Sequence, residues 1–203
     1  MIYTLSRIIF TIILKVLTRL EIYGIENIPM SGPFILASNH ASNADPAVLG
    51  VLSPKTHIIF MAKRELFDIP VFGAWFRAMD CVPIERYSAR FGPLKKSVRK
   101  LQEGKALGIF PEGTRSTDGK FKKAQPGIGF IAHMSGAPII PVYISGTDRV
   151  LPRGRKFIRL SKVKAKVGHA VDISESAKMR DKRKRYQSIG EDVMRSILQL
   201  KMG

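Results

Sequence analysis

A histidine and an aspartate five positions apart are the first residues whose types and spacing could do chemistry. His40 and Asp45 lie in the segment NHASNADP, residues 39–46. Asp45 suits the N-cap of a helix and Pro46 suits its first turn, so the loop can fold Asp45 back toward His40. A carboxylate on one ring nitrogen fixes the imidazole tautomer and leaves the other nitrogen free to take a proton. General-base catalysis of this kind is worth about 10²–10⁴-fold in rate; the alternative for such a pair is a capping and hydrogen-bonding role.

A nucleophile on the protein itself is not indicated. The chain has no Gly-x-Ser-x-Gly elbow, which argues against a serine hydrolase. Cys81 is the only cysteine, and its place in an apolar run predicts a buried packing residue. A single cysteine allows no intrachain disulfide and no zinc cluster, in keeping with a reducing compartment. His40 would therefore act on a hydroxyl that the substrate brings, and that hydroxyl would attack an acyl thioester directly.

An α/β fold is the expected scaffold for these residues, because short apolar runs alternate with helical patterns along the chain. We expect helices from 45, at 88–104, at 127–135 and from about 181, with a short helix or turn at 70–79, and strands at 33–39, 57–63, 81–86, 106–110, 137–145 and 161–167. His40 and the Gly-Thr-Arg turn after 106–110 both follow the carboxyl ends of predicted strands. Ligands bind at that edge of α/β sheets.

Composition predicts a folded domain with an unusual affinity for anions. The 203 residues fit one domain, and 45% hydrophobic with 25% charged residues argues against disorder. The net charge of +18 would attract nucleic acid, anionic lipid surfaces or phosphorylated substrates. Nucleic-acid binding would be strongly salt-dependent, but no zinc finger or RNP aromatic block is present. We therefore expect no nucleic-acid partner.

The N-terminal segment 1–20 predicts an amphipathic helix at a membrane interface, ahead of the main domain at 21–203. Its longest uncharged run, Ile8 to Leu14, is too short to span a bilayer, and no small-residue cleavage site marks a signal peptide. On a helix, one broad side carries Arg7, Lys15 and Arg19, and the other carries Ile9, Ile13, Val16 and Leu20. Such a helix lies on an anionic leaflet. The alternative is an ordinary helix packed on the core. Since only thirty-nine residues precede His40, we expect the protein to sit on the membrane rather than cross it.

Two motifs in order carry a family resemblance. Asn39-His40-x4-Asp45, followed by FPEGTRS at 110–116, resembles the glycerolipid acyltransferase family, and most of all its bacterial lysophosphatidic acid acyltransferases. The second motif is much the more specific. MAKREL at 61–66 and VPIER at 82–86 resemble the segments between the motifs, and Ile140-Pro141-Val142 resembles the family's fourth block. The resemblance covers roughly residues 22–155.

The resemblance implies a fold and a role for each matching residue. The fold would be a single-domain, glycerol-phosphate-acyltransferase-like mixed sheet flanked by helices. His40 would be the base and Asp45 its orienting partner. The substrate-binding residues would be Glu112, Gly113 and Thr114 for positioning the acceptor, and Lys63, Arg86 and Arg115 for holding a phosphate. A phosphate monoester needs cationic donors, and backbone N–H groups near Gly113 could bind an oxyanion. Taken singly, Lys63 and Arg86 are equally well explained as surface charges.

The reaction implied is transfer of a fatty acyl group from acyl-CoA or acyl carrier protein to the free hydroxyl of lysophosphatidic acid, giving phosphatidic acid in phospholipid biosynthesis. No cofactor or metal is implied, and His57, His133 and His169 are scattered as structural residues would be. Partners would be the anionic bilayer and the thioester donor, with the protein peripheral or monotopic at the cytoplasmic face of the membrane. Open alternatives are another lysophospholipid, glycerol-3-phosphate or an amine-bearing lipid as acceptor, and a catalytically silent lipid-binding protein.

Overall fold

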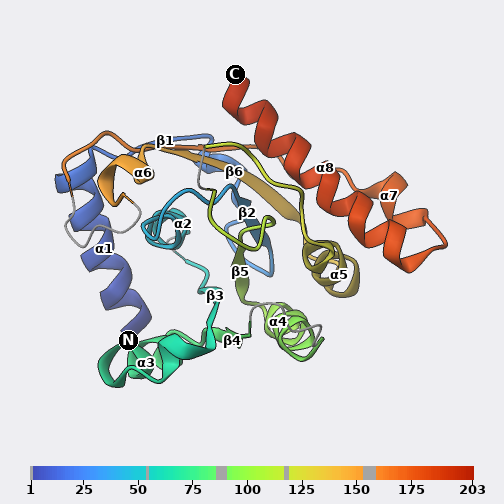
Figure 1. The fold of residues 1–203 in the computed structure, drawn as a ribbon, viewed down its shortest axis with the longest axis horizontal. Helices are drawn as coiled ribbons and strands as arrows, with labels where there is room; N and C mark the ends of the chain where they lie inside the picture. Colours follow the sequence, from blue (N-terminus) through green and yellow to red (C-terminus); the bar gives the residue numbers. More distant parts are fainter. Residues whose placement is uncertain (1, 54, 86–90, 117–118, 153–158) are drawn as a thin grey trace.

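A central mixed sheet organises the chain. The computed structural model describes residues 2–53, 55–85, 91–116, 119–152 and 159–203. In these residues seven strands form one sheet in the order β1-β7-β6-β2-β5-β3-β4 (Figure 1). The strands are β1 (Glu21–Tyr23), β2 (Ile35–Ser38), β3 (Ile58–Lys63), β4 (Val82–Ile84), β5 (Ala106–Ile109), β6 (Ile139–Ser145) and β7 (Lys164–Val167).

The strand directions confirm the expected mixed sheet. Strands β6, β2, β5, β3 and β4 are parallel neighbours. Strand β7 runs antiparallel to β6, and β1 pairs parallel with β7. The carboxyl ends of β2 and β5 therefore meet at one edge of the sheet, which places the two sequence motifs next to each other.

Helices cover both faces of the sheet (Figure 1). Helices α1 (Ile2–Thr18) and α2 (Asp45–Leu52) lie on one face, and α4 (Gly92–Gln102), α5 (Pro126–Ser135) and α8 (Lys182–Met202) lie on the other. The shorter helical segments are η1 (Ile25–Asn27), η2 (Arg64–Phe67), α3 (Pro70–Ala78), α6 (Thr147–Val150) and α7 (Ser174–Lys178).

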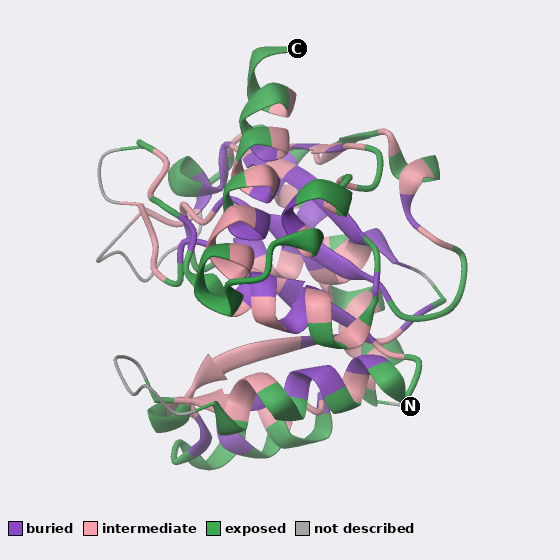
Figure 2. Cartoon of the chain, turned by 90° about the vertical axis from the view of Figure 1, so that its right-hand side faces the viewer, coloured by how far each residue is buried: buried purple, intermediate pink, exposed green. Residues whose placement is uncertain are grey.

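The core is split into two layers by the alternation of side chains along the central strands. Leu36 packs with the α1 and α2 layer, whereas Ile35 and Ala37 pack with the α4, α5 and α8 layer. All three are fully buried. Figure 2 shows buried residues gathered in the strands and on the inner faces of the helices, with exposed residues on the outer faces. Full burial of each large aliphatic side chain is worth about 1.5–3 kcal/mol, so both layers hold β2 in place.

Helix α1 is present, but its faces differ from those expected. Leu14 is buried in the core and Ile13 is partly buried, while Ile9 and Val16, expected on the same side as Ile13, are exposed. The helix is thus apolar on two sides: one side packs on the domain, and the other is exposed. The outer apolar residues are Ile2, Leu5, Ile8, Ile9, Ile12 and Val16.

Most local predictions are confirmed. The strand expected at 161–167 is β7, and its wet face is visible in the alternation of buried Ala165 and Val167 with half-buried lysines. Gly104, with φ +81°, ends the turn after α4. Cys81 is a buried free cysteine, and burial raises the pKa of its thiol to about 11. Strand β1 and helices α6 and α7 were not predicted, because segments of three to five residues carry too little periodicity.

Candidate active site

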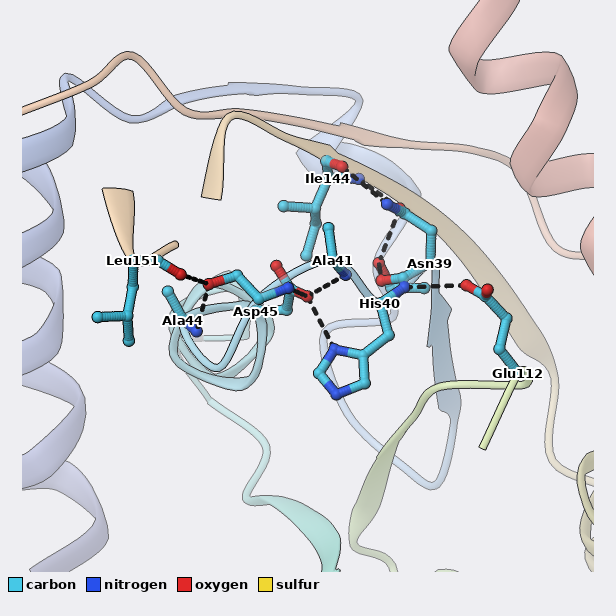
Figure 3. A network of polar contacts seen from close by, with 10 residues as sticks. Asn39, His40, Ala41, Ala44, Asp45, Glu112, Ile144 and Leu151 are labelled. Carbon is cyan, nitrogen blue, oxygen red and sulfur yellow. Dashed lines mark hydrogen bonds and ion pairs between the residues drawn. The ribbon is translucent and has the colours of Figure 1, made fainter. Parts of the chain in front are cut away.

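Asn39 fixes the carboxyl end of β2, where the first motif begins. Its side-chain oxygen accepts the N–H of Ile144 at 2.8 Å, and its side-chain nitrogen donates to the carbonyl of Ile144 at 2.9 Å. Asn39 therefore extends the β2–β6 pairing with a side chain in place of backbone. This tie holds the residue that follows, His40, just outside the sheet (Figure 3).

The His40–Asp45 pair predicted from the sequence is formed. His40 Nδ1 lies 2.8 Å from Asp45 Oδ2, and the same oxygen accepts the N–H groups of Ala41 and Ser42 at 2.7 Å each (Figure 3). Asp45 is fully buried. The expected N-cap role is wrong: Ala44 is the N-cap, and Asp45 is the first residue of α2. Its carboxylate reaches back to the loop and so organises the loop around the imidazole.

The imidazole of His40 is held on one face as well as at Nδ1. Its ring stacks on Phe110, with centroids 4.0 Å apart and planes 16° apart. Since a carboxylate can only accept, we assign the proton to Nδ1, which leaves a lone pair on Nε2. Among the described residues Nε2 has no protein partner, and it points away from Asp45 (Figure 3). The arrangement is that of a general base with its second nitrogen available.

Glu112 joins the two motif loops. One of its carboxylate oxygens accepts the His40 N–H at 3.1 Å, and the other accepts the Lys122 N–H at 3.0 Å. The side chain is 2% exposed. The N–H of Ser116 adds a third tie, to the His40 carbonyl at 2.8 Å. Glu112, expected to position the acceptor, is thus bonded at both oxygens to backbone and positions the His40 loop itself.

Gly113 lies in a tight turn whose backbone conformation favours glycine. Its φ is +68°, in the left-handed region that favours glycine, and its N–H donates to the Phe110 carbonyl at 3.0 Å. That N–H is therefore already engaged. Within the described residues the backbone N–H groups of Thr114 and Arg115 make no hydrogen bond to protein acceptors. They are the remaining donors of this turn for an oxyanion or a phosphate.

Lys63 ends β3 at the same edge of the sheet. Phe60 and Leu36 both pair with Gly108, so Lys63, three residues beyond Phe60, is level with Asn39. Two strand spacings of about 4.8 Å separate β3 from β2, which places Lys63 beside the His40 loop on the β5 side. Another of the three predicted phosphate ligands, Arg86, lies outside the described residues.

A cleft of about 660 Å³ opens beside His40 on the β6 side. Of the predicted residues, it includes His40 and Glu112 and leaves out Lys63, Thr114 and Arg115. Of the other lining residues, Asn39, Ala41 and Ser116 lie within the two motifs. Sequence reasoning missed those that lie outside the motifs; the only signal for their cations was the basic surplus of the chain. The other lining residues are Asn39, Ala41, Ser116, Gly119, Lys120, Phe121, Tyr143, Ile144, Ser145, Gly146, Asp148, Arg149, Pro152 and Lys201.

The family of the chain follows from comparison with known proteins. Residues 19–145, which include both motifs, match the model of the family described as Acyltransferase. The chain belongs to the acyltransferase family. An acyltransferase crystallised from Thermotoga maritima, the 1-acyl-sn-glycerophosphate acyltransferase PlsC, is similar over 98% of this chain and 78% of its own, with a TM-score of 0.74 and 30% identity.

Curated acyltransferases from bacteria and plants are similar in sequence. The 1-acyl-sn-glycerol-3-phosphate acyltransferase of Bacillus subtilis is 29% identical over 84% of this chain and 83% of its own length. The chloroplastic enzyme of that name from Brassica napus is 34% identical over 69% of this chain. This acyltransferase chain spans only 41% of the length of the Brassica protein.

The described residues form neither a metal-binding cluster nor a membrane-spanning helix. No group of three or more His, Cys, Asp or Glu side chains in the described ranges could hold a metal ion. In the same ranges, no helix combines the length and the apolar character needed to cross a bilayer.

Proposed function

We propose that this acyltransferase moves a fatty acyl group from an acyl thioester to the free hydroxyl of lysophosphatidic acid, giving phosphatidic acid for phospholipid synthesis. The observation that carries the proposal is the His40–Asp45 pair packed on Phe110 of the second motif, with Nε2 free at the cleft. The names of the similar bacterial and plant proteins support the choice of acceptor.

The geometry supports direct transfer without an acyl-enzyme. His40 Nε2 takes the proton of the acceptor hydroxyl while its oxygen attacks the thioester carbonyl carbon. The buried carboxylate of Asp45 stabilises the imidazolium that forms. The N–H groups of Thr114 or Arg115 stabilise the oxyanion of the tetrahedral intermediate. When the intermediate collapses, the carbon–sulfur bond breaks and the thiol takes its proton from His40, which restores the neutral base.

The acceptor phosphate is assigned to the Lys63 side of His40. Lys63 lies level with Asn39 at the end of β3, and the second motif places Arg115 after β5, the strand between β3 and β2. A phosphate held there would leave the glycerol hydroxyl within reach of His40. Arg86 is proposed as a third cation for the same phosphate on the strength of the family resemblance.

The outer apolar face of α1 continues onto α3 and is proposed to dock on the membrane. Trp75 of α3 donates from Nε1 to the hydroxyl of Ser6 at 2.9 Å and packs edge-on against Phe10, so the two helices form one surface. Beside α1, this surface exposes Ile69, Val71 and Phe72. An exposed apolar area with nearby cations such as Lys15 fits an anionic leaflet, and we propose peripheral attachment at the cytoplasmic face.

The test of function is an acyl-transfer assay with lysophosphatidic acid and both acyl-CoA and acyl carrier protein donors. The wild type is expected to form phosphatidic acid, and His40→Ala is expected to lose transfer while still binding lipid vesicles. Near-normal turnover by His40→Ala would refute the proposed mechanism. Product with glycerol-3-phosphate or another lysophospholipid, and none with lysophosphatidic acid, would reassign the acceptor.

Membrane docking has its own test in vesicle co-sedimentation. Ile8→Glu with Ile12→Glu places two charges on the outer face of α1 and should abolish binding to anionic vesicles. Leu198→Glu, an exposed apolar residue of α8, is the matched control and should bind as the wild type does. Equal binding by all three proteins would refute this surface.

A further inference from the structure

The cleft beside His40 has two walls that come from outside the sequence motifs. One wall is formed by the carboxyl end of β6 and by α6, with Tyr143, Ser145 and Arg149. The other is formed by Phe121 and by Lys201 near the end of α8. His40 and Glu112 line the same cleft, so whatever enters between these walls reaches the base.

Two cations of this cleft, Arg149 and Lys201, are available to a ligand. Lys201 Nζ lies 5.3 Å from the centre of the Phe121 ring, and within the described residues neither Lys201 nor the Arg149 guanidinium makes a hydrogen bond or an ion pair. Both side chains are exposed. Of the two carboxylates that line the cleft, Glu112 is buried and bonded to backbone, and Asp148 lies exposed next to Arg149. The wall is therefore suited to an anion that also carries hydrogen-bond donors.

His40 is approached from two sides, and the two sides have separate cations. Strands β6 and β5 flank β2 on opposite sides, and β3 follows β5. Lys63 at the end of β3 therefore lies on one side of the base, and the cleft of Arg149 and Lys201 lies on the other. An acyl transfer between two anionic substrates needs two such approaches that meet at one base. This step rests on the proposed function, which places the acceptor phosphate at Lys63.

We propose that the cleft between α6 and the end of α8 binds the phosphopantetheine arm of the acyl donor, with Arg149 and Lys201 contacting its phosphate. Coenzyme A and acyl carrier protein share this arm, so the site serves either source. The arm also carries two amides and a hydroxyl group. Ser145 and Asp148 can accept from its N–H groups, and the Tyr143 phenol can donate; burial, and secondarily the charge of Asp148, raise the pKa of that phenol further above neutral.

Binding of a non-transferable donor tests the site without the acceptor. The probes are hexadecyl-coenzyme A, a thioether, and acyl carrier protein carrying the same thioether on its phosphopantetheine. The double variant Arg149→Ala with Lys201→Ala should bind the accepted probe about tenfold more weakly, since two exposed charge contacts are lost. Its KM for the acyl donor should rise by a similar factor, with the KM for lysophosphatidic acid unchanged.

The matched control is Lys182→Ala, which removes the same charge from the same helix about 28 Å from Lys201 along its axis. It should bind both probes as the wild type does.

Weakened binding by the double variant of hexadecyl-coenzyme A alone, of the carrier-protein probe alone, or of both, identifies the source of the arm and supports the site. The site is refuted if the wild type binds neither probe, if the double variant binds like the wild type, or if Lys182→Ala loses as much. Probe binding that depends on Arg149 and Lys201, without acylation of lysophosphatidic acid, would refute the acceptor and leave the donor site standing.

Discussion

Replacing Asp45 by asparagine separates the charge of the carboxylate from its hydrogen bonds. All three bonds, from His40 Nδ1, Ala41 N–H and Ser42 N–H, reach the same oxygen, Oδ2, at 2.7–2.8 Å. The other oxygen, Oδ1, is buried and has no partner among the described residues. An asparagine with its carbonyl oxygen at the Oδ2 position therefore keeps the tautomer and the loop and loses the negative charge, while its NH2 group takes the unpartnered place of Oδ1.

The size of the effect follows from where that charge acts. The imidazolium exists only after His40 has taken the proton, so the loss appears in the transition state. Opposite charges about 4 Å apart at an effective dielectric constant near 20 interact by about 4 kcal/mol, and a charge-assisted hydrogen bond exceeds a neutral one by about 2 kcal/mol. A loss of 2–4 kcal/mol corresponds to a kcat lower by about 30- to 900-fold. Both KM values should stay near those of the wild type, because Asp45 is fully buried and contacts no substrate.

The loss of kcat is measured from initial rates, and the loss of stability from thermal unfolding, for Asp45→Asn beside Asp45→Ala. Alanine removes the one oxygen that accepts all three bonds, so it should lower the free energy of unfolding by about 2–4 kcal/mol as well as kcat, whereas asparagine should lower mainly kcat. Wild-type turnover by Asp45→Asn would show that the carboxylate is only a loop anchor. Equal losses of stability in both variants would show that the bonds to Oδ2 need the charge to persist.

Three further outcomes are expected. Glu112→Gln turns an amide against the N–H of either His40 or Lys122, which should cost about 1–3 kcal/mol of stability in urea unfolding and lower kcat; unchanged unfolding would refute the tie between the loops. Gly129→Ala would place a Cβ against the backbone of Tyr186, forcing α5 and α8 apart, so the midpoint of thermal unfolding should fall by several degrees, whereas an unchanged midpoint would contradict this close packing. Cys81, with its pKa raised to about 11 by burial, should react with iodoacetamide at pH 8 on the order of 100-fold more slowly in the folded protein than in the unfolded one, as followed by mass spectrometry; equal rates would show an accessible thiol.

The reacting pair and the scaffold were predictable from the sequence because their signals are local. Only four residues separate His40 from Asp45, and an apolar strand before the loop with Pro46 after it limits how the loop can fold. The hydrogen-bond partners of the Asp45 side chain were not predictable. Its side chain could cap α2 or turn back to the loop, and the N–H groups of Ala41 and Ser42 decide for the loop.

Features that depend on distant pairing could not be predicted. The role of Glu112 depends on the His40 N–H, seventy-two residues away, and Arg149 and Lys201 meet at one cleft only once α6 and α8 are packed. Periodicity also could not predict which of the two apolar sides of α1 is buried, because an exposed apolar side and a buried one have the same sequence pattern. The exposure of Ile9 and Val16 follows from tertiary structure alone.

The pairing of β1 at the edge of the sheet has a consequence for how the protein folds during its synthesis. Strand β1 pairs with β7, and Glu21 lies opposite Lys164, so this contact closes a loop of 143 of the chain's 203 residues. During synthesis at about 5–20 residues per second, α1 and β1 leave the ribosome several seconds before their partner strand exists. Non-local pairing of this kind also forms slowly. The outer apolar face of α1 therefore meets water or a bilayer before the sheet can close, and the proposed attachment to a membrane can precede folding of the domain.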